Sequence, residues 1–144
     1  MPIYEVQVSP PSGLQSGGPC LPVDIALPQI LVDRLNQQGS PVPPPISGHA
    51  LIDTGASVSV VETSVITRLQ INPIGVTTIG TAAGQVRRNL YPSRFIFPRL
   101  VVDLSPIIGA DLSSFQIIAL IGRDILSRFL FIYHGPAGRI TLTF

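Results

Sequence analysis

Residues 50–57, with the sequence ALIDTGAS, constrain this chain more than any other segment. They place the carboxylate of Asp53 on a tight turn directly after an apolar run that is typical of a buried strand. Gly55 lets the backbone turn sharply without a Cβ clash, and the Thr54 hydroxyl can hydrogen-bond nearby backbone groups and hold the loop. The same three residue types are common in ordinary turns, so the triplet alone fits a structural turn equally well. The sequence around it favours a functional site.

Two further segments give the triplet a context. Residues 119–126, with the sequence ALIGRDIL, lie far downstream. The run 117–121 carries no charge, which is typical of a strand buried on both faces, and Asp124 can cap a helix over residues 125–129. Between the two motifs, residues 77–86 read TTIGTAAGQV and predict a glycine-containing hairpin. Two such motifs in this order are more specific than one tripeptide.

In this order the segments resemble the retropepsin-like aspartic proteases, the family of retroviral proteases and their cellular relatives. The resemblance covers roughly residues 46–133. It implies an all-β fold, a retropepsin-like acid protease barrel with one or two short helices and one lobe per chain. It also implies that the hairpin at residues 77–86 is a flap that closes over substrate, although a plain surface hairpin has the same pattern.

The resemblance assigns roles to individual residues. Asp53 is the expected catalytic acid, Thr54 braces the two catalytic loops of a dimer against one another, and Gly55 permits their approach. The residues expected to bind substrate are Ala56, Ser57, Ile79, Gly80, Thr81, Ala82, Ala83, Gly84 and Ile121. The residues expected to support the site are Gly122, Arg123 and Asp124.

The chain departs from the retroviral pattern after the catalytic triplet. In many retroviral proteases the catalytic loop continues to acidic residues, one of which pairs with the arginine of the second motif. Here the loop continues as Ser57-Val58-Ser59, so Arg123 needs another partner, such as a backbone carbonyl, or is exposed. Four other aspartates are expected to be solvated or to cap local turns, although each could pair with Arg123: Asp24, Asp33, Asp103 and Asp111.

The chain length predicts one domain over residues 1–144. Within it we expect N-terminal strands and Pro/Gly-rich loops at 1–45, a catalytic core at 46–133 and a C-terminal hairpin strand at 134–144. Residues 91–104 are rich in β-branched and aromatic residues, and Pro92 and Pro98 interrupt them, so we expect two short strands or one broken edge strand. The other expected elements are strands at 4–8, 23–27, 57–61, 129–133 and 139–144, a helical turn at 30–35, a helix over 61–69, and loops at 9–19, 41–45 and 105–114.

A single Asp-Thr-Gly implies two chains. Peptide hydrolysis by carboxylates needs a general base that activates water and a general acid that protonates the scissile carbonyl oxygen. Two carboxyls about 3 Å apart supply both, because the pair keeps a shared proton, as is known for aspartic proteases. The chain is too short for two lobes and holds one such triplet, so the second Asp53 is expected from a second copy on a two-fold axis.

Composition narrows the possible partners. A formal net charge of +1 gives no broad positive field for nucleic acid, and no apolar run of about 18 residues could span a bilayer. Charged residues are few and every basic residue is arginine, which favours an apolar surface covered by oligomerisation. Cys20 is the only cysteine, and with two histidines in the chain we expect neither metal nor cofactor. We expect a soluble, cytoplasmic protein.

The sequence therefore predicts an aspartic endopeptidase, a homodimer that cleaves extended polypeptides at apolar residues through a water activated by an Asp53 pair. The alternative is a catalytically silent peptide-binding or dimerisation module on the same fold. A close carboxylate pair has no use in such a module and argues against it. A glycosidase-type carboxylate pair is poorly supported, because no second acidic residue stands out.

Overall fold

The computed structural model describes residues 2–143, apart from the side chain of Ser105. The strands are β1 (Ile3–Gln7), β2 (Cys20–Ala26), β3 (Ile46–Ile52), β4 (Val60–Glu62), β5 (Gly75–Thr81), β6 (Gly84–Phe97), β7 (Leu100–Ala110), β8 (Ala119–Ile121), β9 (Leu130–His134) and β10 (Arg139–Thr143). The helices are α1 (Ser12–Gly17), α2 (Gln29–Gln37), α3 (Thr63–Arg68) and α4 (Arg123–Leu126), with 3₁₀ turns η1 (Ser113–Phe115) and η2 (Gly135–Ala137).

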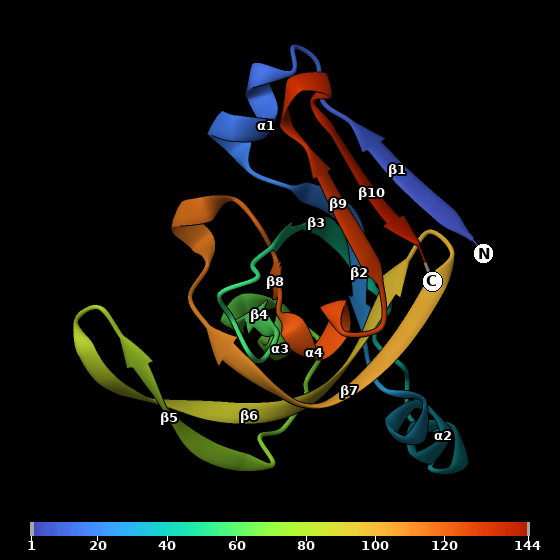
Figure 1. The fold of residues 1–144 in the computed structure, drawn as a ribbon. Coiled ribbons are helices and arrows are strands. Elements are labelled where there is room, and N and C mark those ends of the chain that lie inside the picture. The colour runs from blue at the N-terminus through green and yellow to red at the C-terminus, as the bar shows by residue number, and fades with distance from the viewer. Residues whose placement is uncertain (1, 144) are drawn as a thin grey trace.

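Two sheets make up the described chain (Figure 1). The larger has seven strands in the order β2-β3-β8-β4-β7-β6-β5, and a further pairing of β2 with β6 closes part of it into a barrel. The smaller has the order β1-β10-β9 and brings the two ends of the chain side by side. Strand β3 pairs in parallel with β8, which places the Asp53 turn next to the second motif. The predicted all-β fold with short helices is confirmed.

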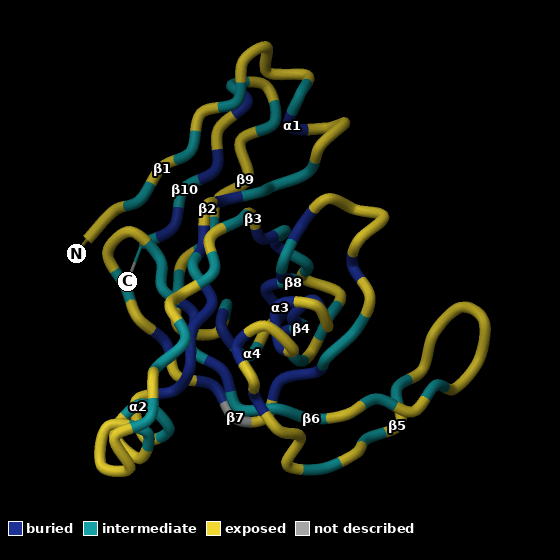
Figure 2. Tube along the Cα trace, turned by 180° about the vertical axis from the view of Figure 1, so that it is seen from behind, coloured by how far each residue is buried: buried dark blue, intermediate teal, exposed yellow. Residues whose placement is uncertain are grey.

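The core lies inside the larger sheet, where the dark segments of Figure 2 gather. Alternation along β2 buries Leu21, Val23 and Ile25, whereas the residues between them are partly or fully exposed. This period of two is what a strand with one face toward a core requires. The strands that carry the two motifs reach the core at their paired residues Ala50 and Ala119, which have no exposed surface.

The β-rich segment at residues 91–104 follows its prediction at one proline and not at the other, because Pro98 lies between strands β6 and β7 whereas Pro92 interrupts neither strand. Strand β6 runs without interruption for 14 residues, because Pro92 sits at a register shift where the ladder needs no N–H from it. Strand β7 extends to Ala110, so the loop expected at residues 105–114 begins only after that residue. The extension follows from pairing with both β6 and β4, which supplies backbone partners that local sequence does not reveal.

Three shorter elements also differ from their predictions. Helix α1 falls within residues 9–19, which were expected to form a loop, and its Leu14 is buried in the core. Strand β4 covers only Val60–Glu62, because residues 57–59 belong to the loop that follows Asp53. Helix α4 begins at Arg123, so Asp124 lies in its first turn and not at the cap.

The two ends of the chain form a sheet within one copy. The predicted C-terminal hairpin is confirmed, with β9 and β10 in antiparallel register, and β1 pairs with the other side of β10. Ile140 and Leu142 share the buried face as predicted, whereas Phe144, expected on the same face, lies outside the described residues. Strands β1 and β9 are therefore the two edges of this sheet.

Candidate active site

Asp53 lies at the exit of β3, on a turn held by its own carboxylate. Its Oδ1 accepts a hydrogen bond of 2.9 Å from the Gly55 N–H, and its carbonyl accepts one of 3.2 Å from Ala56. The Asp53 N–H donates to the Ile121 carbonyl at 2.9 Å, so the turn is tied to the end of β8. Because the bond to Gly55 uses one carboxylate oxygen, the other remains able to contact water or a second carboxyl.

The second motif holds the loop that follows Asp53 through a buried serine. Asp124 accepts hydrogen bonds from the Ser59 N–H at 2.8 Å and from the Ser59 hydroxyl at 2.6 Å. Ser59 has no exposed surface, and its Oγ in turn accepts the Gly122 N–H at 2.9 Å. Hydrogen bonds to a charged acceptor are stronger than neutral ones, and a buried donor left without a partner is costly. The network therefore fixes the loop after Asp53 against helix α4.

Gly122 allows this close approach. A Cβ built at this position would lie 2.8 Å from the Val58 carbonyl carbon and 3.0 Å from the Ser59 nitrogen. Both are backbone atoms, which cannot move aside as a flexible side chain can. The glycine of the second motif is thus required for packing of the two motifs, and its backbone conformation is extended.

Arg123 finds its partner in the Asp-Thr-Gly triplet itself. Its Nη1 donates a hydrogen bond of 2.7 Å to the carbonyl of Thr54, and its N–H donates one of 2.9 Å to Ala56. Of the two outcomes that the sequence left open, the structure shows the backbone carbonyl. None of the four aspartates offered as alternatives contacts it: Asp103, for example, forms an ion pair with Arg94 at 2.7 Å.

The loop that follows Asp53 opens onto a cavity of about 550 Å³ that lies under the hairpin of β5 and β6. Among the predicted substrate-binding residues, Ala56 and Ser57 line its floor, while Ile79 and Gly80 line its roof. Thr81, Ala82, Ala83 and Gly84 form the exposed hairpin tip beyond the cavity. The structure therefore brings the floor and the middle of the hairpin together and leaves the tip free.

The tip is a tight turn stabilised by its own residues. The Thr81 hydroxyl donates to the Gly84 carbonyl at 2.7 Å and accepts the Ala83 N–H at 3.2 Å. Gly84 has a φ of 114°, a conformation that other residues rarely adopt. The tip therefore needs glycine at this position.

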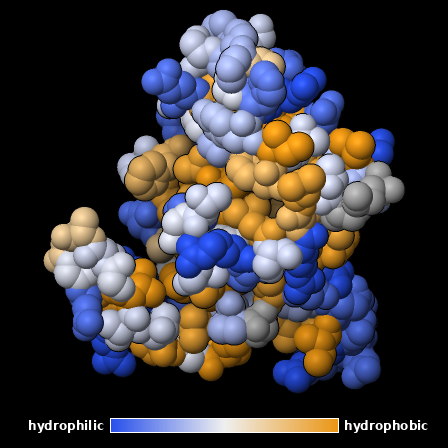
Figure 3. Space-filling model, in the orientation of Figure 1, coloured by the Kyte–Doolittle hydropathy of each residue, from blue (hydrophilic) through white to orange (hydrophobic). Residues whose placement is uncertain are grey.

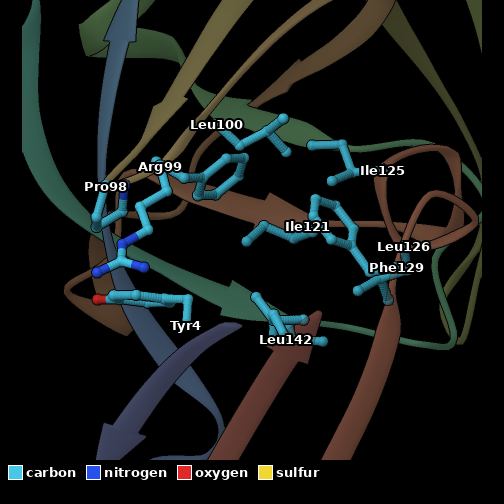
Figure 4. A pocket seen from close by; sticks show the side chains of 11 residues that line it. Tyr4, Pro98, Arg99, Leu100, Ile121, Ile125, Leu126, Phe129 and Leu142 are labelled. Carbon is cyan, nitrogen blue, oxygen red and sulfur yellow. The ribbon is translucent and has the colours of Figure 1, made fainter. Parts of the chain in front are cut away.

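Ile121 lies apart from the cavity. It is buried, and its side chain lines a separate apolar pocket of about 20 Å³ with Tyr4, Leu142 and Ile125 (Figure 4). That volume holds about one water molecule, so the pocket is a packing defect of the core and no substrate site. Strand alternation explains the difference, because Leu120, the preceding residue, pairs with Val60 and shares its face. Val60 lines the cavity.

Solved structures have a fold similar to that of this chain. The retropepsin-like aspartic protease from Rickettsia conorii is 16% identical with a TM-score of 0.52, and the match covers 98% of this chain and 91% of that one. The EIAV protease, solved with the inhibitor HBY-793, is 24% identical with a TM-score of 0.50, covering 76% of this chain and 86% of that one. The chain has a retropepsin-like fold. No protein-family model and no curated protein sequence matches it.

Sequence reasoning missed much of the cavity wall of this retropepsin-like fold. The signal was present in part, because Thr77 and Thr78 belong to the predicted hairpin and Val60 follows the catalytic loop. The others come from segments whose position only the strand order reveals. The lining residues absent from the predicted site are Val58, Val60, Thr77, Thr78, Leu90, Pro106 and Ile108.

Other reactive groups of the retropepsin-like chain lie away from the cavity. Burial raises the pKa of the Cys20 thiol, which makes it a poorer nucleophile at neutral pH. No group of three or more His, Cys, Asp or Glu side chains within residues 2–143 could hold a metal ion. None of the helices in that range is both long and apolar enough to cross a bilayer.

Proposed function

We propose that two copies of this chain form an aspartic endopeptidase in which each copy supplies one Asp53 carboxylate. The observation that carries the proposal is the placement of the single Asp-Thr-Gly turn, whose Gly55, together with Ala56 and Ser57, lines a cavity roofed by a glycine-tipped hairpin. The fold shared with the Rickettsia protease supports it.

The reaction uses the two carboxyls in different protonation states. The ionised carboxylate takes a proton from water, whose oxygen adds to the carbonyl carbon, while the protonated carboxyl donates its proton to the carbonyl oxygen. Collapse of this intermediate breaks the C–N bond, and the departing amine takes a proton from the site. One carboxyl cannot hold both roles, so a single copy of the chain is incomplete.

The surface beside the site supports a second copy. Thr54 and Gly55 are exposed in the single chain, although they lie at the centre of the proposed site. Strand β9, an edge of the smaller sheet, exposes Leu130, Ile132 and Tyr133. Figure 3 shows hydrophobic side chains gathered on this face, in the region where β9 and α4 lie in Figure 1. An unpaired strand edge with exposed apolar side chains is a ready surface for pairing between chains.

The cavity favours apolar residues near the scissile bond. None of its lining side chains is charged, and the walls come from Val60, Ile79, Leu90 and Ile108. Strand β5 is an edge of the larger sheet, so its backbone can hydrogen-bond an extended peptide. We therefore propose extended polypeptides as the substrate, cleaved next to apolar side chains.

The catalytic test compares the wild type with Asp53→Asn, and with Asp33→Asn as a matched control on the exposed face of α2. Each is incubated with an unfolded protein from acidic to neutral pH, with and without a statine-type transition-state analogue. We expect Asp53→Asn to lower the cleavage rate by roughly 10²–10⁴-fold and Asp33→Asn to leave it unchanged. Equal cleavage by wild type and Asp53→Asn would remove Asp53 from the mechanism. Binding of peptide without cleavage by the wild type would favour the silent module.

The dimer test uses the two edges of the smaller sheet. Ile132→Lys places a charge on the exposed edge strand β9, and Ile3→Lys does the same on the opposite edge, β1. We expect Ile132→Lys to shift sedimentation toward the monomer and to lower activity per chain on dilution, whereas Ile3→Lys resembles the wild type. A wild type that is monomeric and fully active at every concentration contradicts the two-chain site.

A further inference from the structure

Two adjacent arginines of β6 lie on opposite faces of the hairpin. Arg87 is exposed and pairs in register with Thr78, whereas Arg88 is half-buried and pairs with Thr77. Side chains alternate along a strand, so Arg88 shares its face with Leu90, two residues further on. Leu90 is the residue of β6 that lines the cavity. Arg88 is therefore on the cavity-facing side of the hairpin, and Arg87 is on the outer side.

The Arg88 guanidinium is poorly satisfied by the rest of the chain. Its Nε is buried and has no hydrogen-bond partner among the described residues, while its Nη1 donates only to the neighbouring Arg87 carbonyl at 3.2 Å. The ion pairs among these residues are Arg94 with Asp103 and Arg139 with Glu5, and neither includes Arg88. An arginine stays charged at any relevant pH, and a buried donor without a partner is unfavourable.

The surrounding sequence offers no acid to neutralise this charge. Residues 63–102, which include the whole hairpin, contain five arginines and neither aspartate nor glutamate. Glu62, just before this segment, is already occupied, because its carboxylate accepts the N–H groups of Ser64 and Leu112. Arg88 therefore carries a positive charge with no acidic partner on the cavity-facing side of the hairpin, and the residues that line the cavity, which do not include Arg88, are uncharged.

We propose that Arg88 is a specificity residue that pairs with an acidic side chain of the bound peptide, an inference that rests on the proposed peptidase function. A guanidinium recognises a carboxylate through two parallel N–H···O bonds, which adds both energy and geometric selectivity. Arg88 lies four residues from Gly84 at the hairpin tip, or about 13 Å along the strand. If the tip closes over the scissile bond, an extended peptide places the acid roughly three or four residues from that bond.

The preferred substrate therefore combines two features, uncharged residues at the scissile bond and one acidic residue further along the peptide. Uncharged side chains occupy the cavity next to the scissile bond, and a glutamate or aspartate lies further along the peptide, under the base of the hairpin. A dimer presents two copies of Arg88, so an acid on either side of the bond can be recognised.

The test uses peptides that differ only in Glu or Gln at one position, scanned from two to five residues on each side of an apolar cleavage site. The protein variants are Arg88→Met, which keeps an apolar stem and removes the charge, and Arg87→Met as the matched control on the outer face. At one position we expect the wild type and Arg87→Met to prefer Glu by about tenfold in kcat/KM, mainly through KM. Arg88→Met should lose the preference, and Arg88→Glu should reverse it toward Arg-containing peptides.

The outcomes separate this inference from the proposed function. If the wild type cleaves peptides without preferring Glu at any position, or if Arg88→Met keeps the preference, the role of Arg88 is refuted while the peptidase stands. If the wild type cleaves no peptide, the peptidase fails, and binding of the Glu and Gln peptides to Asp53→Asn protein decides the role of Arg88. Equal binding of the Glu and Gln peptides at every position refutes the role of Arg88. Tighter binding of the Glu peptide by Asp53→Asn supports it, provided that the preference disappears in the double variant Asp53→Asn/Arg88→Met. Matching thermal unfolding of the two methionine variants checks that both fold.

Discussion

The floor and the roof of the cavity are held by different kinds of contact. The floor is bonded across long distances in sequence, since Ser59 and Asp124, 65 residues apart, share two hydrogen bonds and Gly122 adds a third. The tip of the roof is held by bonds within four residues, from Thr81 to Gly84. Segments with few buried contacts open at low free energy, whereas densely bonded segments open only with the whole domain. From this difference we expect the floor around Asp53 to be rigid and the tip of the roof to open more easily.

Removing the Asp124 carboxylate tests whether its hydrogen bonds to Ser59 hold the floor of the cavity, and we expect the largest effect from this change. Asp124→Ala leaves the buried N–H and hydroxyl of Ser59 without their acceptor, so we expect the free energy of unfolding to fall by about 3 kcal/mol. Urea denaturation measures the change, with Asp33→Ala on the exposed face of α2 as the control, expected within about 0.5 kcal/mol. Equal stability of the two variants would mean that the floor is held by other contacts.

A pair of glycine substitutions tests the same contrast through packing. Gly122→Ala forces its Cβ against the Val58 backbone, and we expect a loss of about 2 kcal/mol in unfolding free energy. Gly80→Ala, in the roof, meets nothing within 4 Å and should stay within about 0.5 kcal/mol of the wild type. Thermal unfolding of both variants under one condition makes the comparison. A destabilised Gly80→Ala together with an unaffected Gly122→Ala reverses the assignment of floor and roof.

The smallest expected effect is at the hairpin tip. Thr81→Val removes the bonds from the hydroxyl to Gly84 and Ala83 while keeping the branched shape, so global stability should change by less than about 1 kcal/mol. Amide hydrogen exchange within residues 77–86 should become faster, because the tip opens locally, while exchange near Ser59 stays unchanged. Accelerated exchange at both places would show that roof and floor unfold as one unit.

Sequence reasoning succeeded where a few neighbouring residues decide the structure. The turn at Asp53, the hairpin around Gly84 and the strand before Gly122 follow from turn chemistry and apolar runs, which are local properties. Sequence reasoning failed where a strand residue can face either the core or the cavity. Ile121 was assigned to the substrate site, but the register of β8 directs it into the core and gives the cavity-side face to Leu120. An apolar run buried on both sides carries no alternation from which that face could be read.

The sequence by itself determined that a carboxylate stands on an Asp-Thr-Gly turn, that a glycine-containing hairpin follows and that a second apolar motif ends in Gly-Arg-Asp. The tertiary structure alone decided which residues those motifs touch: Asp124 holds Ser59, Arg123 holds the Thr54 carbonyl, and Arg88 lies beside the cavity without an acid. The physical reason is the distance along the sequence between the residues that interact. Turns and strand periodicity depend on residues a few positions apart, whereas these contacts depend on strand order and register across most of the chain.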